Sequence, residues 1–180
     1  MRRVMAGFVL AAVIGVLACG GRAWAELPKE SPKPLRVGTY DSRALAVAFA
    51  PSEVHETSLK ALIKEHAEAK AAGDVEKVKR LDAEGQARQD LMHQQGFGTA
   101  PVDNILKHIA DQLPAIAREV GVDVIVSKWQ ITWQAPGVET VDVTDLMVRP
   151  FKPSERTLKT IADLRRHAPL SAEQLKNFKD

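Results

Sequence analysis

The pattern of apolar and polar positions over residues 52–95 is typical of two consecutive helices. Ser52 suits the N-cap of the first helix, and Gly73 followed by Asp74 supplies a helix end and a new cap. The second helix is weakly apolar, because Gly85 and polar residues interrupt its stripe. The pattern therefore predicts a helical hairpin that turns at Gly73.

The clearest periodicity lies in a helix expected to end at Gly121, where apolar side chains recur at spacings of four and three. This seam consists of Val102, Leu106, Ile109, Leu113, Ile116 and Val120. Pro114 lies inside the seam and predicts a kink near Leu113. Two hypotheses fit: the seam packs within its own hairpin and the adjoining body, or it joins several copies of the chain.

Alternating apolar and polar residues predict short strands at residues 35–40, 122–126 and 129–134. The last strand would place Trp129 and Trp133 on one face. We expect this face to pack in the core beneath the helices rather than to form a ligand platform.

The remaining segments complete an α+β prediction. Residues 141–148 are expected to form a short strand or a turn of helix capped at Thr144. Residues 149–180 form a C-terminal helical extension, with Ser154 opening one helix and a capping box at Ser171 opening a last turn. The expected fold is a small β-body with a coiled-coil-like helical hairpin and an extra C-terminal helix.

Residues 1–25 have the order of parts found in a secretion signal. Two arginines precede an apolar run over residues 4–18, which is shorter than the roughly 20 residues that span a bilayer. Cleavage after Ala25 would leave residues 26–34, which are rich in proline, as a flexible linker. We therefore expect an exported, periplasmic protein.

A lipoprotein signal over residues 1–18 is the alternative. Residues 16–19 (Val-Leu-Ala-Cys) resemble a lipobox, in which Cys19 would be acylated and become the new N-terminus. The protein would then be lipid-anchored in the envelope, and it has a membrane contact only in this case. The mass of the mature N-terminus separates the two hypotheses.

The composition of the mature chain limits the partners and kinds of site that we expect. Without Arg2, Arg3 and Arg22, the chain has 22 Lys and Arg against 23 Asp and Glu, a formal net charge of −1. This balance gives no indication of nucleic acid as a partner. Cleavage after Ala25 also removes the single cysteine, so that neither a disulfide nor a thiolate metal site is expected.

No residue pattern indicates catalysis, a metal or a cofactor. The five histidines form no recognised metal motif, and the loop around Gly96 and Gly98 is explained by the end of a helix. Carboxylates and an arginine could make a hydrolase site if they met, but helix capping and ordinary ion pairing explain them more simply. They are Asp41, Arg43, Asp142 and Asp145. We expect no enzyme.

The order of these segments resembles the periplasmic OmpH/Skp chaperones over about residues 35–148. The resemblance is carried by residues 36–41 (Arg-Val-Gly-Thr-Tyr-Asp), the hairpin about residues 52–95, and residues 121–145, which contain Val-Asp-Val-Ile-Val-Ser-Lys, Ile-Thr-Trp and Asp-Val-Thr-Asp. It implies a β-body from which helical hairpins hang around a cavity. This interpretation depends on the hairpin and on pairing of residues 122–126 with residues 129–134.

The resemblance implies a trimer that holds unfolded outer-membrane or periplasmic clients without ATP. The client-binding residues would be Leu59, Leu62, Ile63, Val78 and Leu81. A non-catalytic structural or adaptor protein of the envelope that shares the fold is the first alternative, favoured by short arms and neutral charge. A small exported hydrolase is the second.

Overall fold

The computed structural model describes residues 33–177, which belong to one compact unit. These residues form an α+β fold, as the sequence predicts. The predicted signal over residues 1–25, the alternative acylation of Cys19 and nearly all of the linker lie outside the described residues. The C-terminal extension is described as far as Asn177.

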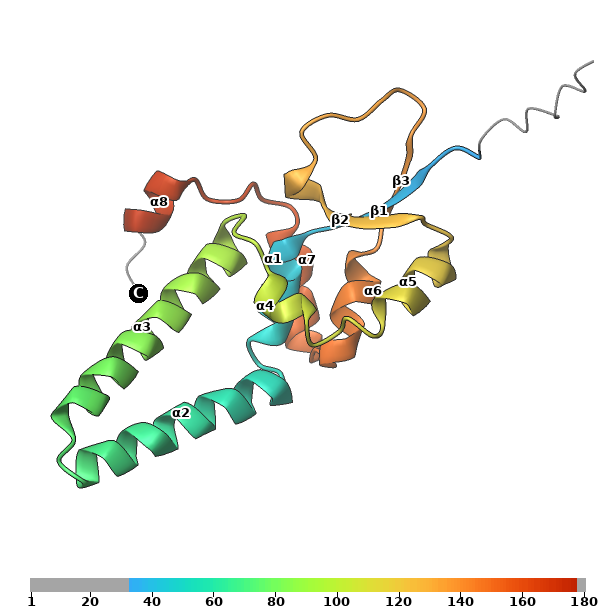
Figure 1. Ribbon diagram of the computed structural model, residues 1–180. Helices are drawn as coiled ribbons and strands as arrows, with labels where there is room; N and C mark the ends of the chain where they lie inside the picture. The colour runs from blue at the N-terminus through green and yellow to red at the C-terminus, as the bar shows by residue number, and fades with distance from the viewer. Residues whose placement is uncertain (1–32, 178–180) are drawn as a thin grey trace, which may run out of the picture. The chain divides into compact units, whose positions relative to one another are not determined.

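The described strands form one parallel sheet. Strand β1 (Arg36–Tyr40) lies between β2 (Val124–Ser127) and β3 (Glu139–Asp142). Val37 pairs with Val124 on one side and with Thr140 on the other. The strands predicted near residues 35–40 and 122–126 are thus confirmed, and the sheet joins segments from both ends of the hairpin excursion (Figure 1).

The predicted strand over residues 129–134 is wrong. The 3-10 helix η1 (Lys128–Gln130) follows β2 directly, and residues 131–138 form an irregular loop. Ser127 Oγ accepts a hydrogen bond from the Trp129 backbone N–H, and the Trp129 indole binds Asp41, so the chain turns where the alternating pattern predicts extension. The pairing of residues 122–126 with residues 129–134 is therefore absent, and the third strand is β3.

The hairpin is confirmed. Helix α1 (Ser42–Phe49) leads into α2 (Glu53–Ala71), and α3 (Val75–Phe97) returns. Gly73 adopts the left-handed conformation, with φ of 69°, which an L side chain rarely tolerates. The Ser52 and Asp74 side chains cap α2 and α3 as expected. In Figure 1 the two helices diverge from this turn toward the body.

The prediction of one continuous helix that carries the seam is also wrong. Helix α4 (Asp103–Leu106) ends early, turns follow over residues 107–112, and α5 (Leu113–Val120) begins again. Pro114 lies in the first turn of α5, where its missing N–H costs no helical hydrogen bond. All six seam residues nevertheless pack in or against one hydrophobic core within the chain. The seam thus packs within the body of one chain, and joining of copies stays a prediction.

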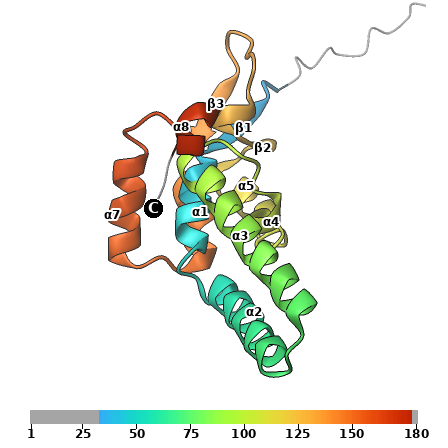
Figure 2. The same cartoon turned by 90° about the vertical axis from the view of Figure 1, so that its left-hand side faces the viewer.

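Helix α1 forms the centre of that core. Ala44, Leu45 and Ala48 are fully buried, and α1 packs against α3, α6 (Thr144–Val148) and α7 (Glu155–Leu164). Figure 2 shows α7 beside α1, with the hairpin extending away from both.

The segment over residues 141–148 contains the end of β3 and helix α6, with Val143 rather than Thr144 at the cap position.

The predicted C-terminal extension is confirmed as helical over the described residues. It contains the 3-10 helix η2 (Arg149–Phe151), α7 and α8 (Ala172–Asn177). Ser154 caps α7, and the reciprocal bonds between Ser171 and Gln174 form the expected capping box. Leu170 N–H donates to Phe97 O (2.8 Å), so this extension contacts the end of α3.

Substitution Gly98→Ala is expected to detach α8 from α3. An added Cβ would lie 2.7 Å from Leu175 Cδ1 and 2.8 Å from Gln94 O, so we expect a loss of about 1–3 kcal/mol in unfolding free energy and faster proteolysis near residue 170. Gly85→Ala is the matched control, since nothing lies within 4 Å of its added Cβ and alanine favours a helix. Equal protease resistance of the two variants would contradict the expected steric contact.

Candidate functional site

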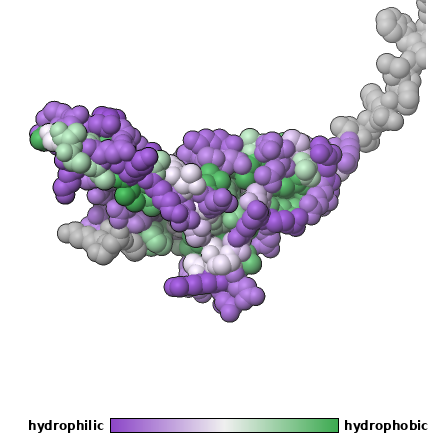
Figure 3. Space-filling model, turned by 90° about the horizontal axis from the view of Figure 1, so that it is seen from below, coloured by the Kyte–Doolittle hydropathy of each residue, from purple (hydrophilic) through white to green (hydrophobic). Residues whose placement is uncertain are grey.

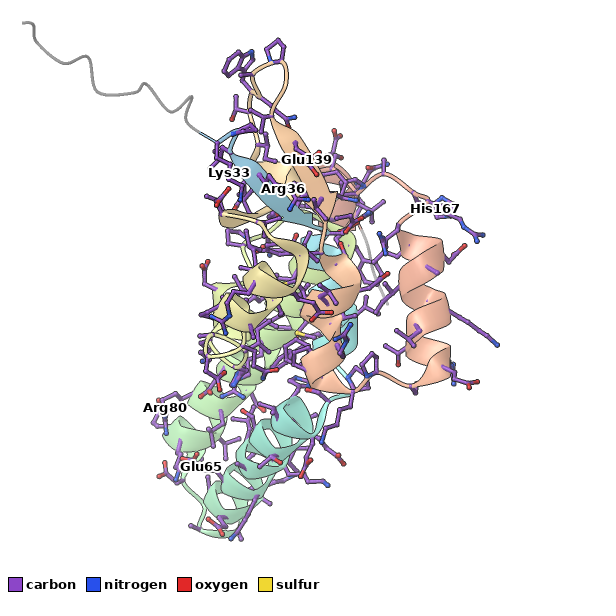
Figure 4. All side chains as sticks on the ribbon, turned by 90° about the vertical axis from the view of Figure 1, so that its right-hand side faces the viewer. Lys33, Arg36, Glu65, Arg80, Glu139 and His167 are labelled. Carbon is purple, nitrogen blue, oxygen red and sulfur yellow. The ribbon has the colours of Figure 1, made fainter. Side chains whose placement is uncertain are left out.

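The hairpin is held near its tip by contacts between α2 and α3. Leu81 and Ala69 are buried there, and Figure 4 shows Glu65 and Arg80 in this part of the molecule. Glu65 Oε1 lies 3.0 Å from Lys77 Nζ, and His66 Nε2 lies 3.0 Å from Asp82 Oδ1. Farther from the turn, Arg88 Nη1 donates to Ser58 Oγ (3.1 Å), so polar contacts join the two helices at more than one level of the hairpin.

The residues predicted to bind clients divide into two rows. Leu81 is 3% exposed, and Leu62 and Val78 are half-buried. By contrast, Leu59 is 41% exposed and Ile63 is 58% exposed, and the two lie one helical turn apart on α2. We call Leu59 and Ile63 the outer row. The five residues expected to form one client-binding surface thus differ in how far they are exposed.

Further apolar side chains on the hairpin, outside the predicted client-binding set, are also exposed. Val54 at the start of α2 and Val75 at the start of α3 are both exposed. Figure 3 shows apolar patches among mostly polar side chains on the hairpin, at the left of the view. The apolar surface is therefore interrupted.

Charges of both signs are paired along the hairpin. Lys60 Nζ lies 2.7 Å from Glu56 Oε1, and Arg88 Nη2 lies 2.6 Å from Glu84 Oε1. Such exposed pairs each contribute about 0–1 kcal/mol and are screened by salt. Because neighbouring charges compensate one another, binding to this surface would depend on apolar contact more than on long-range attraction.

A second candidate lies at the carboxyl ends of the parallel strands. These ends meet at one edge of the sheet, where Asp41 follows β1 and Lys128 follows β2. The Asp41 carboxylate accepts hydrogen bonds from Arg43 Nε (3.0 Å), Arg43 Nη2 (2.8 Å) and Trp129 Nε1 (3.1 Å). Lys128 Nζ lies 2.8 Å from Asp41 Oδ2. The Asp41 backbone N–H donates to Thr144 Oγ1 (3.0 Å).

Opposite charges stabilise the ionised form of Asp41 inside the protein. The side chains of Asp41 and Arg43 are almost completely buried. Burial by itself would raise the pKa of Asp41, but hydrogen bonds from Arg43 and Lys128 outweigh it and lower the pKa to about 2. The carboxylate is therefore ionised and a poor proton acceptor near neutral pH, as expected of a structural ion pair.

This edge of the sheet extends to the C-terminal extension. Arg165 bonds to both Asp142 and Asp145, and Arg43 Nη1 donates to His167 O (3.0 Å). Burial raises the pKa of Asp142, but bonds from Thr144 and Arg165 give a net lowering. The structure thus connects the four residues considered for a hydrolase, and their contacts are capping and ion pairs.

Sequence reasoning missed Lys128 and Arg165 at this edge and placed Trp129 on a strand instead. The available signal was that charged residues follow the strands, but the mistaken strand over residues 129–134 concealed it. Burial of both tryptophans on one strand face is also wrong: Trp133 is 77% exposed on the loop. Trp129 is half-buried, with Lys128 Nζ 4.4 Å and Arg43 Cζ 4.9 Å from its ring centroid.

The stability of the protein is expected to depend on acid titration of Asp41. Its contribution is present above the unfolded pKa of about 4 and is lost as pH falls toward the folded pKa of about 2, a change of roughly 2 kcal/mol. Urea unfolding of the wild type and of Asp41→Asn at several pH values measures this change. The difference in stability between the two proteins should shrink on acidification, and a difference independent of pH would contradict the prediction.

The remaining candidate sites are metal-binding clusters and surface grooves. No group of three or more His, Cys, Asp or Glu side chains among residues 33–177 is placed to hold a metal ion. A groove of about 610 Å³ lies between the end of α3 and the C-terminal extension, with Gln94, Leu170 and Leu175 in its walls. Within the described part of the chain, the helices are too short or too polar to cross a membrane.

No protein-family model, curated protein or solved structure matches this chain.

Proposed function

We propose that this protein is an exported, non-enzymatic, chaperone-like protein that holds unfolded outer-membrane or periplasmic clients on its helical hairpin without ATP. The observation that carries the proposal is the outer row, in which Leu59 and Ile63 are exposed on a hairpin that its own contacts define. The periplasmic location rests on the predicted secretion signal.

The size and polarity of the hairpin suit weak binding of short segments. Helix α2 has 19 residues and is therefore about 28 Å long, the length of roughly eight residues of extended chain. Each apolar contact would contribute about 25 cal/mol for every Å² removed from water. Several separated contacts of this kind would hold an unfolded client and release it when the client buries its own apolar residues.

The fold supports this proposal only through the hairpin and its base. Strands β1 and β2 pair at the base of the excursion, as the resemblance requires, but the expected pairing with residues 129–134 is absent. That pairing was a condition of the resemblance, so the resemblance no longer supports the proposal. Membership of the OmpH/Skp chaperones and assembly into a trimer stay predictions, and the mass of the assembled protein in solution tests the second.

A holdase assay tests the proposed function. The exported protein should suppress aggregation of a urea-denatured β-barrel protein diluted into buffer, without ATP and with little dependence on salt. Serum albumin at equal mass controls for crowding. Failure to suppress aggregation of several denatured β-barrel and periplasmic proteins would rule the activity out.

An adaptor with one defined partner is the second candidate. The short hairpin and the paired charges along it favour this function, because they provide a small surface with a fixed pattern. Pull-down from envelope extracts separates the candidates. A chaperone should recover many clients in small amounts, whereas an adaptor should recover one partner in stoichiometric amount.

A further inference from the structure

The loop between η1 and β3 displays a tryptophan that the rest of the described protein does not cover. Trp133 is 77% exposed, the largest value among the exposed large apolar residues of the described chain. Residues 129–138 contain no charged side chain. A tryptophan ring exposed among uncharged neighbours offers a large contact area with one apolar and one polar part.

Both ends of this loop are fixed to the body. At its start, the Trp129 indole donates to Asp41, whose carboxylate also binds Arg43. At its end, a turn in which Gly137 has φ of 87° is closed by Gln134 Nε2 donating to Val138 O (3.0 Å). The loop is therefore held at a defined place while Trp133 projects from it.

The loop ends beside the start of β1, close to the first described residues of the chain. Arg36 pairs with Glu139 in the register of β1 and β3, and their side chains form an ion pair at 2.8 Å. Figure 4 shows Lys33, Arg36 and Glu139 at the same end of the sheet as the loop. The carboxylate that follows the loop in sequence, Glu139, is thus paired with Arg36, which lowers the cost of bringing this end to an apolar or anionic surface.

We propose that the loop over residues 130–138 inserts Trp133 into the interface of a lipid bilayer. Tryptophan is enriched at membrane–water interfaces, because its ring is amphipathic. The lipoprotein alternative, in which the acyl chains on Cys19 lie in a bilayer, places a membrane beside the mature chain. The 14 residues from Cys19 to Lys33 span at most roughly 50 Å, so an acylated N-terminus would keep this loop near the bilayer.

Fluorescence quenching by brominated lipids tests this insertion. The exported protein is studied in a Trp24→Phe background, in which Trp129 and Trp133 are the emitting residues of the mature chain. Vesicles of phosphatidylethanolamine and phosphatidylglycerol should shift the emission to the blue, and brominated acyl chains should quench it. In Trp133→Ser the quenching should disappear, and vesicle binding of the non-acylated chain should fall about tenfold or more.

Leu158→Ser is the control, since Leu158 is also an exposed large apolar residue (45%, against 77% for Trp133) but lies on α7. It should bind vesicles and be quenched like the parent protein, and circular dichroism should show that both variants are folded. Accessibility of Trp133 to iodide in the presence of vesicles, without quenching by brominated lipids, would overturn the proposal. A blue shift that requires only higher protein concentration, or only a denatured client, would overturn it in favour of a second copy or a client on this loop.

Discussion

Substitution Asp41→Ala is expected to lower the free energy of unfolding by about 3–5 kcal/mol. The reason is that the Arg43 guanidinium is buried, and Asp41 supplies its only carboxylate within the described ion pairs. The same carboxylate also receives Lys128 and the Trp129 indole, so the substitution deprives three side chains of this acceptor. Urea unfolding at neutral pH measures the loss.

Glu139→Ala is the matched control for this loss. Glu139 pairs with Arg36 at the same distance, 2.8 Å, but its side chain is largely exposed, so we expect a cost of about 0–1 kcal/mol. Should Asp41→Ala unfold the chain entirely, Asp41→Asn retains an acceptor and gives a measurable intermediate value. Equal, small losses in Asp41→Ala and Glu139→Ala would contradict the structural role of the buried pair.

The double substitution Leu59→Ser with Ile63→Ser is expected to reduce affinity for denatured clients about tenfold or more. Each side chain is roughly half exposed in the free protein, so covering it with a client would contribute on the order of 1 kcal/mol. The free energy of unfolding should change less than on substitution of a buried residue such as Leu81, because both side chains are already partly in water. Titration of a fluorescently labelled denatured client measures the affinity.

Leu158→Ser again provides the control, because it removes an equally exposed leucine from α7. Its client affinity should match that of the wild type. Unchanged affinity in the double variant, with Leu158→Ser equally unaffected, would remove the outer row from the proposed function. Equal losses in both proteins would instead indicate nonspecific hydrophobic binding over the whole surface.

The hairpin was predictable because its signals are local. Ser52, Gly73 and Asp74 act within one or two turns of the chain, and each performs the capping or turning role expected from its residue type. The same applies to Ser154 and the Ser171 capping box in the C-terminal extension. Local hydrogen bonds determine these boundaries, so sequence spacing is sufficient to place them.

Long-range contacts explain where the sequence patterns failed. Trp129 turns toward Asp41, a residue 88 positions earlier, and this contact replaces the strand expected from alternation. The heptad spacing over residues 102–120 is used for packing in one core, but turns over residues 107–112 interrupt the helix. A periodic pattern shows which side chains are buried without fixing the backbone between them.

The same distinction between local signals and long-range contacts applies to the candidate sites. Apolar spacing located the hairpin stripe, but only the packing of α2 against α3 separates Leu81 from the exposed Leu59 and Ile63. The cluster at the carboxyl edge depends on three parallel strands, and their order cannot be deduced from charges that lie far apart in the chain. Asp41 was therefore assigned a capping role without its partner Lys128.

Site-specific photo-cross-linking tests client binding at the hairpin most directly. A photoreactive amino acid is placed at position 63 on α2 or at position 158 on α7, and each protein is irradiated with a denatured β-barrel client. Cross-links should form from position 63, decrease as the client folds, and be rare from position 158. Efficient cross-linking from position 158 with none from position 63 would show that clients bind elsewhere and would contradict the proposed function of the hairpin.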